Sequence, residues 1–138
     1  MKVFIYNQDN GRAAVCFPTG DLSLAEMRGR DFPEDAVMIN KEELPMADFD
    51  FRDAWEVVSG SIETNIAKAS DIAKDKIREM RGSKFAIADQ EMLLAIEKGE
   101  SLVTVAAKKT ALRDFPERID SAPTLPAMKS LINQFEAL

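Results

Sequence analysis

The sequence contains no histidine and a single cysteine, Cys16. Without histidine, the chain lacks the most common zinc ligand and the usual general base of enzymes. One cysteine cannot form an internal disulfide, and Cys16 lies in an apolar run with no histidine to activate it, which is typical of an inert buried thiol. These absences argue against an enzyme and against a multi-cysteine metal site.

Long hydrophobic runs are also missing. The sequence has no stretch of about 18 apolar residues that would span a membrane, and its N-terminus lacks the pattern of a signal peptide. We therefore expect a protein that is made in a cytoplasm, or packed into a particle assembled there. The net charge of −6, with acidic and basic residues interspersed, disfavours binding to nucleic acid, which needs clustered lysine and arginine.

The clearest pattern present is helical. Between Ile66 and Ile96 apolar residues recur mostly three or four positions apart, which predicts a long amphipathic helix capped by Asn65. Lys98-Gly99 marks its end, and Ser101 can cap a second helix that reaches residue 115. Two helices joined by so short a turn must lie antiparallel. Gly82-Ser83 leaves open whether the long helix is continuous or broken.

The first part of the chain favours strands. Apolar runs at residues 2–7 and 12–17 flank an Asn-Gly pair, which predicts a β-hairpin. A capping box at Ser23–Glu26 predicts a short helix, and Ala36–Ile39 a third strand. Residues 40–50 are polar and predict a surface connection.

A second hairpin is expected from Phe51–Val58 and Ser61–Glu63, joined by Ser59-Gly60. At the other end of the chain, one helical turn is expected near Ile119, and Thr124 can cap a last helix. We therefore predict an α+β protein. Residues 1–63 form a small N-terminal domain of hairpins and a short helix, and residues 64–138 form an antiparallel helical hairpin with a C-terminal helix.

No motif for catalysis is found. The carboxylate pairs Glu42-Glu43, Asp48/Asp50 and Asp114/Glu117 are typical of solvated loops, and no cofactor or metal is expected. The basic residues between positions 74 and 84 alternate with acids and are typical of a solvated helix face.

An amphipathic hairpin with an apolar terminal helix offers surface for another protein. Trp55 is either a core anchor or an interface hot spot. The candidate partner-binding residues are the large apolar ones of the predicted stripes and this tryptophan: Trp55, Ile77, Met80, Phe85, Met92, Leu112, Phe115, Leu131 and Phe135.

Five segments resemble a family of small tailed-bacteriophage and prophage proteins that are encoded beside tail-fibre genes. The segments cover about the C-terminal two-thirds of the chain: FRDAWEV (51–57), NIAKASDIAKDKIREMR (65–81), ADQEMLLAIEKGES (88–101), AAKKTALRDFP (106–116) and IDSAPTLPAMKSLI (119–132). The chain departs from the family pattern at Ala73, where relatives commonly carry histidine, and at Ser83, where they often carry proline.

The resemblance implies a virion structural protein of the tail, baseplate or tail fibre, acting as an adaptor and binding other phage tail or fibre proteins. It also implies an oligomer, with three copies expected because fibre-associated proteins often form trimers. Two alternatives stay open. One is a tail or tail-fibre assembly chaperone that is not retained in the particle, and the other is an acidic inhibitor of a host defence protein.

Overall fold

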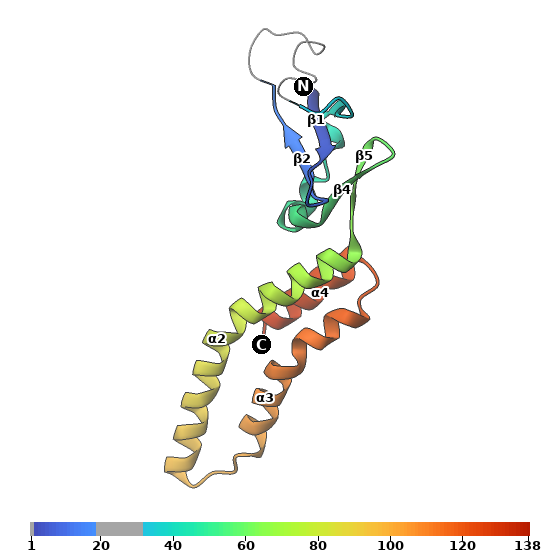
Figure 1. The fold of residues 1–138 in the computed structure, drawn as a ribbon. Coiled ribbons are helices and arrows are strands. Elements are labelled where there is room, and N and C mark those ends of the chain that lie inside the picture. The colour runs from blue at the N-terminus through green and yellow to red at the C-terminus, as the bar shows by residue number, and fades with distance from the viewer. Residues whose placement is uncertain (1, 19–31) are drawn as a thin grey trace. The chain divides into compact units, whose positions relative to one another are not determined.

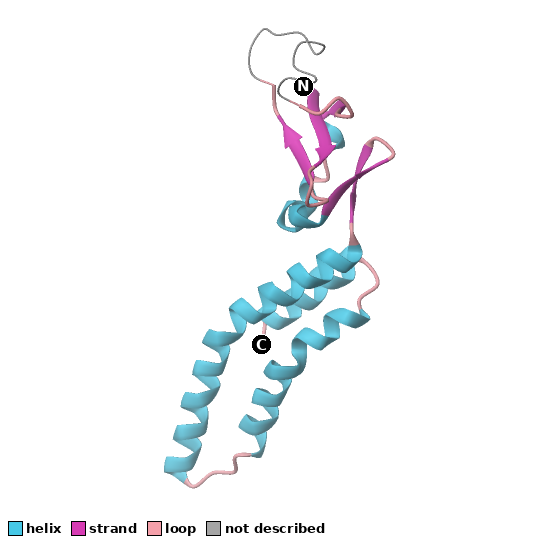
Figure 2. Cartoon of the chain, viewed as in Figure 1, coloured by secondary structure: helices cyan, strands magenta, loops and turns pink. Residues whose placement is uncertain are grey.

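A computed structural model describes residues 2–18 and 32–138 of the chain. The chain divides into two compact units, an N-terminal unit, Met1–Lys68, and a C-terminal unit, Ala69–Leu138. The N-terminal unit holds small antiparallel sheets and the C-terminal unit holds helices (Figure 2), which confirms the predicted α+β class. The short helix predicted after Ser23 lies outside the described residues.

The first sheet has three antiparallel strands in the order β2-β1-β3, with β1 (Lys2–Asn7) in the centre, β2 at Ala13–Cys16 and β3 at Val37–Asn40. The first predicted hairpin and the third strand are thus confirmed. The turn between β1 and β2 uses Gly11 at a φ of +82°, a left-handed conformation that glycine adopts without strain.

Both faces of β1 are covered. Val3 and Ile5 are buried against Ile39 and Leu44 on one face. On the other face the rings of Phe4 and Phe32 stack with 4.7 Å between their centroids. A strand buried on both faces has no alternation of apolar and polar residues, which agrees with the continuous apolar run of β1.

The second sheet is a hairpin of β4 (Trp55–Val58) and β5 (Ser61–Thr64). Ser59 and Gly60 both have positive φ, 52° and 80°, as a two-residue hairpin turn of type I′ requires. The hairpin is confirmed, but its first strand starts four residues later than predicted.

Residues before β4 form two 3₁₀ helices, η1 (Lys41–Glu43) and η2 (Met46–Ala54), where we expected a surface connection and the start of a strand. Phe51 and Ala54 are buried, and residues three apart align on one side of a 3₁₀ helix. This packing of one side explains why residues 51–54 coil instead of extending.

The side chain of Asn7 joins the two sheets. Its amide nitrogen donates to the carbonyl oxygen of Val57 at 3.0 Å, and its amide oxygen accepts from the Val57 N–H at 2.8 Å. Asn7 therefore gives β4 the two hydrogen bonds that a neighbouring strand would otherwise supply.

The long helix α2 runs from Ile66 to Lys98. The side chain of Asn65 caps its start by accepting from the Lys68 N–H at 3.1 Å, as predicted. Glu56 lies beside this cap and accepts hydrogen bonds from Lys68 Nζ at 2.8 Å and Asn65 Nδ2 at 3.0 Å. These two bonds, that from Lys68 first, hold the pKa of Glu56 below its ordinary value.

Helix α2 passes through Gly82 and Ser83 without a break. The helix is followed by Gly99, which has a φ of +68°. The N–H groups of Gly99 and Glu100 donate to the carbonyl oxygens of Ile96 and Ala95 at 3.1 and 2.8 Å. This is the double hydrogen-bond pattern of a glycine C-cap.

The rest of the C-terminal unit is α3 (Val103–Asp114), the 3₁₀ helix η3 (Phe115–Ser121) and α4 (Leu125–Glu136). Figure 1 shows α3 returning beside α2 and α4 lying along the first half of α2. Thr124 Oγ1 accepts from the Ala127 N–H at 3.3 Å, which confirms the predicted cap of α4. The α2–α3 pair is antiparallel, as predicted.

Candidate protein-protein interface

The nine predicted partner-binding residues occupy packed positions. Five are buried and four are half-buried; the buried ones are Trp55, Ile77, Leu112, Phe115 and Phe135, and the half-buried ones are Met80, Phe85, Met92 and Leu131. Sequence periodicity detects the most regular apolar stripe of a helix, and neighbouring elements cover that same stripe first. The structure therefore places most of this set in the interior.

The contacts of α4 with Phe115 and with Lys84 of α2 show how these apolar residues are packed. The rings of Phe115 and Phe135 lie 4.9 Å apart, and the Lys84 amine lies 5.6 Å from the centre of the Phe135 ring. Lys84 Nζ also donates to the carbonyl oxygens of Glu136 at 3.0 Å and Leu138 at 3.4 Å. Helix α4 is thus fixed against the middle of α2.

Most of the exposed large apolar residues of the hairpin lie at its other end, around the turn between α2 and α3. Leu93 and Ile96 of α2 are 61 % and 57 % exposed, and Leu102 and Val103 at the start of α3 are 38 % and 74 % exposed. These four surround the turn at Gly99, and we call them the apolar tip. Ile96 belongs to the predicted apolar stripe of α2; most of that stripe is buried or half-buried, whereas Ile96 is exposed.

The composition of the end of α2 explains the apolar tip. Ala88 and Ala95 face inward and are buried, whereas Leu93 and Ile96 point to other sides of the same helix. A helix that is apolar on every side is usually covered all round, by its own protein or by a partner. The run of apolar residues from Met92 to Ile96, too long for one helix face, was the signal in the sequence that a periodicity search passes over.

Ion pairs bridge the two helices near the apolar tip. Lys108 Nζ lies 3.1 Å from Glu91, and Lys109 Nζ lies 2.6 Å from Asp89. Such partly exposed pairs contribute only about 0.2–1 kcal/mol each to the free energy of unfolding. Their main effect is to favour one alignment of α3 along α2. Alanines fill the inner side of this part of α2, and charged side chains bridge the two helices. The large apolar side chains of the tip are therefore left exposed to solvent.

Several basic residues of α2 take part in contacts within the C-terminal unit. Lys74 pairs with Asp120, Arg78 lies 3.1 Å from Asp75, and Arg81 donates to the carbonyl oxygen of Arg113 at 3.3 Å. Their positive charges are therefore engaged by the protein itself.

The N-terminal unit exposes a smaller apolar group. Met46 and Phe49 of η2 are 52 % and 46 % exposed, and Phe49 contacts the edge of the buried Trp55 ring. Arg52 lies 4.5 Å from the centre of the Phe49 ring. The buried position of Trp55 matches the core-anchor interpretation of this residue.

The acidic side chains of the described residues do not gather into a metal site. Within residues 2–18 and 32–138 no three His, Cys, Asp or Glu side chains come close enough to hold a metal ion. Glu43 accepts from the Asn40 N–H at 2.7 Å and so caps η1. Cys16 is half-buried with its sulfur 4.0 Å from the Tyr6 hydroxyl; burial, and then Cys16, raises the pKa of Tyr6.

Comparison with protein families, with curated proteins and with solved structures finds no match to the chain. Among the helices that the structure describes, none combines the length and the apolar character needed to cross a membrane. The exposed apolar side chains of α2 and α3 are thus the feature that points to a binding surface.

Proposed function

We propose that the chain is a structural protein of a bacteriophage virion that joins tail, baseplate or tail-fibre proteins through the apolar tip. The observation that carries the proposal is the exposure of Leu93, Ile96, Leu102 and Val103 around one turn. The five segments that resemble phage tail proteins support it, because three of them, 65–81, 88–101 and 106–116, make up most of the hairpin. The role is one of binding and not of catalysis.

The energetics of the tip suit a docking contact. Covering a half-exposed leucine or isoleucine contributes about 1 kcal/mol, so four such side chains contribute several kcal/mol to a complex. That gain has to offset the cost of association, and a polar rim usually adds to it. Glu97, Lys98 and Glu100 surround the turn and can form such a rim.

Quantitative mass spectrometry of purified phage particles tests the proposal. A virion component is expected at a fixed copy number relative to the tail proteins. An assembly chaperone would bind tail or fibre protein in the infected cell and be missing from particles, and an inhibitor of host defence would bind a host protein. Either of those two results would overturn the proposal.

Matched variants test the part played by the tip. Leu93→Asp and Val103→Asp are expected to leave the helix content unchanged and to remove the protein from particles. Leu138→Asp is the control, because Leu138 is 53 % exposed but lies outside the tip. Equal incorporation of all three variants would show that the tip is not the docking surface.

A further inference from the structure

A groove of about 390 Å³ lies between η3 and α4 in the C-terminal unit, and we call it the η3–α4 groove. Pockets that bind ligands commonly have volumes of about 300–1,000 Å³. On α4 the groove is lined by Ala127, Leu131 and Gln134, whose spacing of four and three residues places them on one side of the helix. The buried residues Leu125 and Met128 lie on another side. The groove is therefore on the outer side of α4.

Among the described residues that line the η3–α4 groove, Arg118 alone is charged. Residues three apart align on one side of a 3₁₀ helix, so Arg118 shares its side of η3 with Ser121, which also lines the groove. Glu117 and Asp120 form another side, and Asp120 pairs with Lys74 of α2. The groove is thus basic, although the chain as a whole carries a net charge of −6.

The Phe115 ring positions the guanidinium group of Arg118. The central carbon of this group lies 4.8 Å from the centre of the ring. Stacking on a ring leaves the N–H groups at the edge of the guanidinium available, and two of them match the two oxygens of a carboxylate. Within residues 2–18 and 32–138 no carboxylate forms an ion pair with Arg118. A carboxylate of another molecule can therefore take this position.

The rest of the groove offers an apolar floor and a polar edge. Ala122, Ala127 and Leu131 supply the apolar side chains, and Leu131 is one of the nine candidate partner-binding residues. At the edge, Gln134 Nε2 lies 3.5 Å from Ser130 Oγ. Hydroxyl and amide groups both donate and accept hydrogen bonds, as the backbone of an extended peptide requires. The lining is thus suited to an aliphatic side chain and the peptide backbone beside it.

We propose that the η3–α4 groove binds a peptide segment of a partner protein in which an acidic residue is next to an aliphatic one. The carboxylate pairs with Arg118, and the aliphatic side chain covers Ala122, Ala127 and Leu131. Charge selects this occupant, because Arg118 repels a lysine or arginine and is left without a partner by a purely apolar segment. The aliphatic contact is needed as well, since a single exposed ion pair contributes little to affinity.

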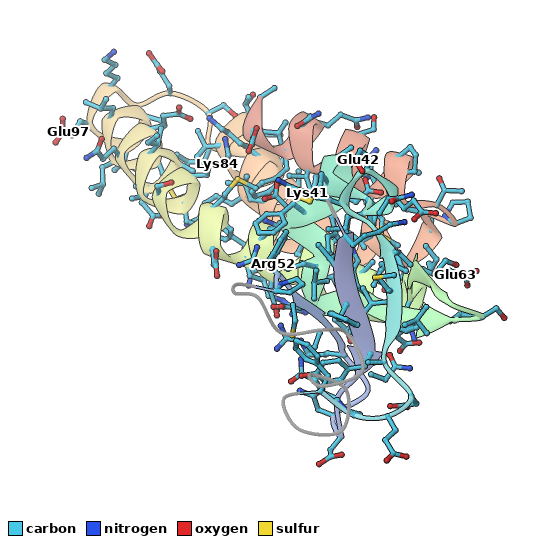
Figure 3. The ribbon with its side chains drawn as sticks, turned by 90° about the horizontal axis from the view of Figure 1, so that it is seen from above. Lys41, Glu42, Arg52, Glu63, Lys84 and Glu97 are labelled. Carbon is cyan, nitrogen blue, oxygen red and sulfur yellow. The ribbon has the colours of Figure 1, made fainter. Side chains whose placement is uncertain are left out.

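The η3–α4 groove and the apolar tip lie at separate places in the C-terminal unit. Figure 3 shows Glu97 at the far end of α2, near the turn of the tip, and Lys84 nearer the middle of the helix. Lys84 contacts the last residues of α4 and precedes Glu97 by 13 residues, or about 20 Å along α2. A chain with both surfaces can hold two partners at once. This last step deepens the proposed function and rests on it, whereas binding in the groove does not.

The first test titrates the full chain, labelled with nitrogen-15, with the peptide acetyl-Ala-Leu-Glu-Ala-amide and follows the backbone amide signals by NMR. We expect saturable shifts at Ser121, Ser130 and Gln134. Peptides with glutamine or lysine in place of glutamate should bind at least about fivefold more weakly, because they give Arg118 no carboxylate. Equal binding of the three peptides, shifts confined to other residues, or no saturable binding at millimolar peptide would overturn the proposal.

A peptide with a free C-terminus separates two sources of a carboxylate. Acetyl-Ala-Ala-Leu presents its carboxylate at the end of the chain and has no acidic side chain. We expect it to bind more weakly than the glutamate peptide, because the groove is open along α4 and accepts a continuing chain. Tighter binding of acetyl-Ala-Ala-Leu would show recognition of a chain terminus and contradict the proposal.

The second test changes the groove. Arg118→Gln is expected to raise the dissociation constant of the glutamate peptide about five- to tenfold and to leave that of the glutamine peptide unchanged. Arg113→Gln removes an exposed arginine outside the groove and is the control, with no change expected. Ala127→Leu places a larger side chain in the groove and should weaken both peptides without loss of helix content. Equal losses with Arg113→Gln and Arg118→Gln would show a general charge effect and refute the proposal.

Failure of the groove and failure of the proposed function are distinguishable, because peptide binding is measured on the isolated chain. Leu93→Asp, at the apolar tip, is expected to bind the glutamate peptide as the unsubstituted chain does. Absence of the chain from phage particles would overturn the proposed function and leave the groove in place. Loss of peptide binding in Leu93→Asp with unchanged helix content would contradict the separation of the two surfaces.

Discussion

The burial of Ile77 allows a sharp test of how the long helix faces the rest of its unit. Ile77 is fully buried in α2, and truncation of a buried isoleucine to alanine removes packed methyl groups and leaves a cavity. The usual cost is about 2–5 kcal/mol, a large part of the 5–15 kcal/mol that stabilises a typical domain. We expect Ile77→Ala to lower the free energy of unfolding by about 3 kcal/mol.

Urea unfolding followed by the helix signal in far-ultraviolet circular dichroism measures this change. With a slope of about 1.5 kcal/mol per molar urea, the midpoint should fall by about 2 M while the slope stays the same. Leu93→Ala is the matched control, because it also truncates a large aliphatic side chain of α2 but at a position that is 61 % exposed.

Leu93→Ala should change the free energy of unfolding by less than about 0.5 kcal/mol, as is usual for surface substitutions. A loss at Leu93 equal to that at Ile77 would refute the facing described here. It would mean that the end of α2 is buried and that the side chains of the apolar tip are not accessible to a partner.

Three further predictions concern single contacts. Glu56→Gln should lower stability at neutral pH and flatten its acid dependence in urea titrations. The lowered pKa of Glu56 means that its contribution is complete above about pH 4.3 and is lost as pH falls through the folded-state value; an unchanged pH profile would contradict this. Gly99→Ala should cost about 1–2 kcal/mol in thermal unfolding because φ is +68°, with Gly82→Ala, in open space, as a neutral or stabilising control. Asn7→Ala should cost about 1 kcal/mol by removing both bonds to Val57, and Asn7→Asp should recover only the bond to the Val57 N–H; hydrogen exchange at Val57 reports on both.

Much of the fold could be predicted because its signals are local. Asn65, Gly99 and Thr124 mark helix ends through side-chain or backbone chemistry that depends on near neighbours only. The Asn-Gly and Ser-Gly turns located both hairpins in the same way. The 3₁₀ helix before β4 could not be predicted, since the burial of Phe51 and Ala54 leaves no regular pattern in the local sequence.

The candidate interface was less accessible to sequence reasoning. Periodicity identified Ile77 and Leu112 as apolar stripe residues, which the structure buries, and it placed Ile96 with them although Ile96 is exposed. Which apolar side of a helix is covered depends on where the neighbouring helices end. The end point of a neighbouring helix depends on the tertiary fold, and only the structure shows that α4 ends beside Lys84.

The attachment of the last residues to Lys84 has a practical consequence for anyone who labels this protein. A tag fused directly after Leu138 would begin beside Lys84, whose amine lies 3.4 Å from the Leu138 carbonyl oxygen, and a bulky tag would disturb this contact. Such a fusion could loosen the end of α4 from α2 without any change in the sequence of the C-terminal unit itself. Tags placed before β1, or removable ones, avoid this effect.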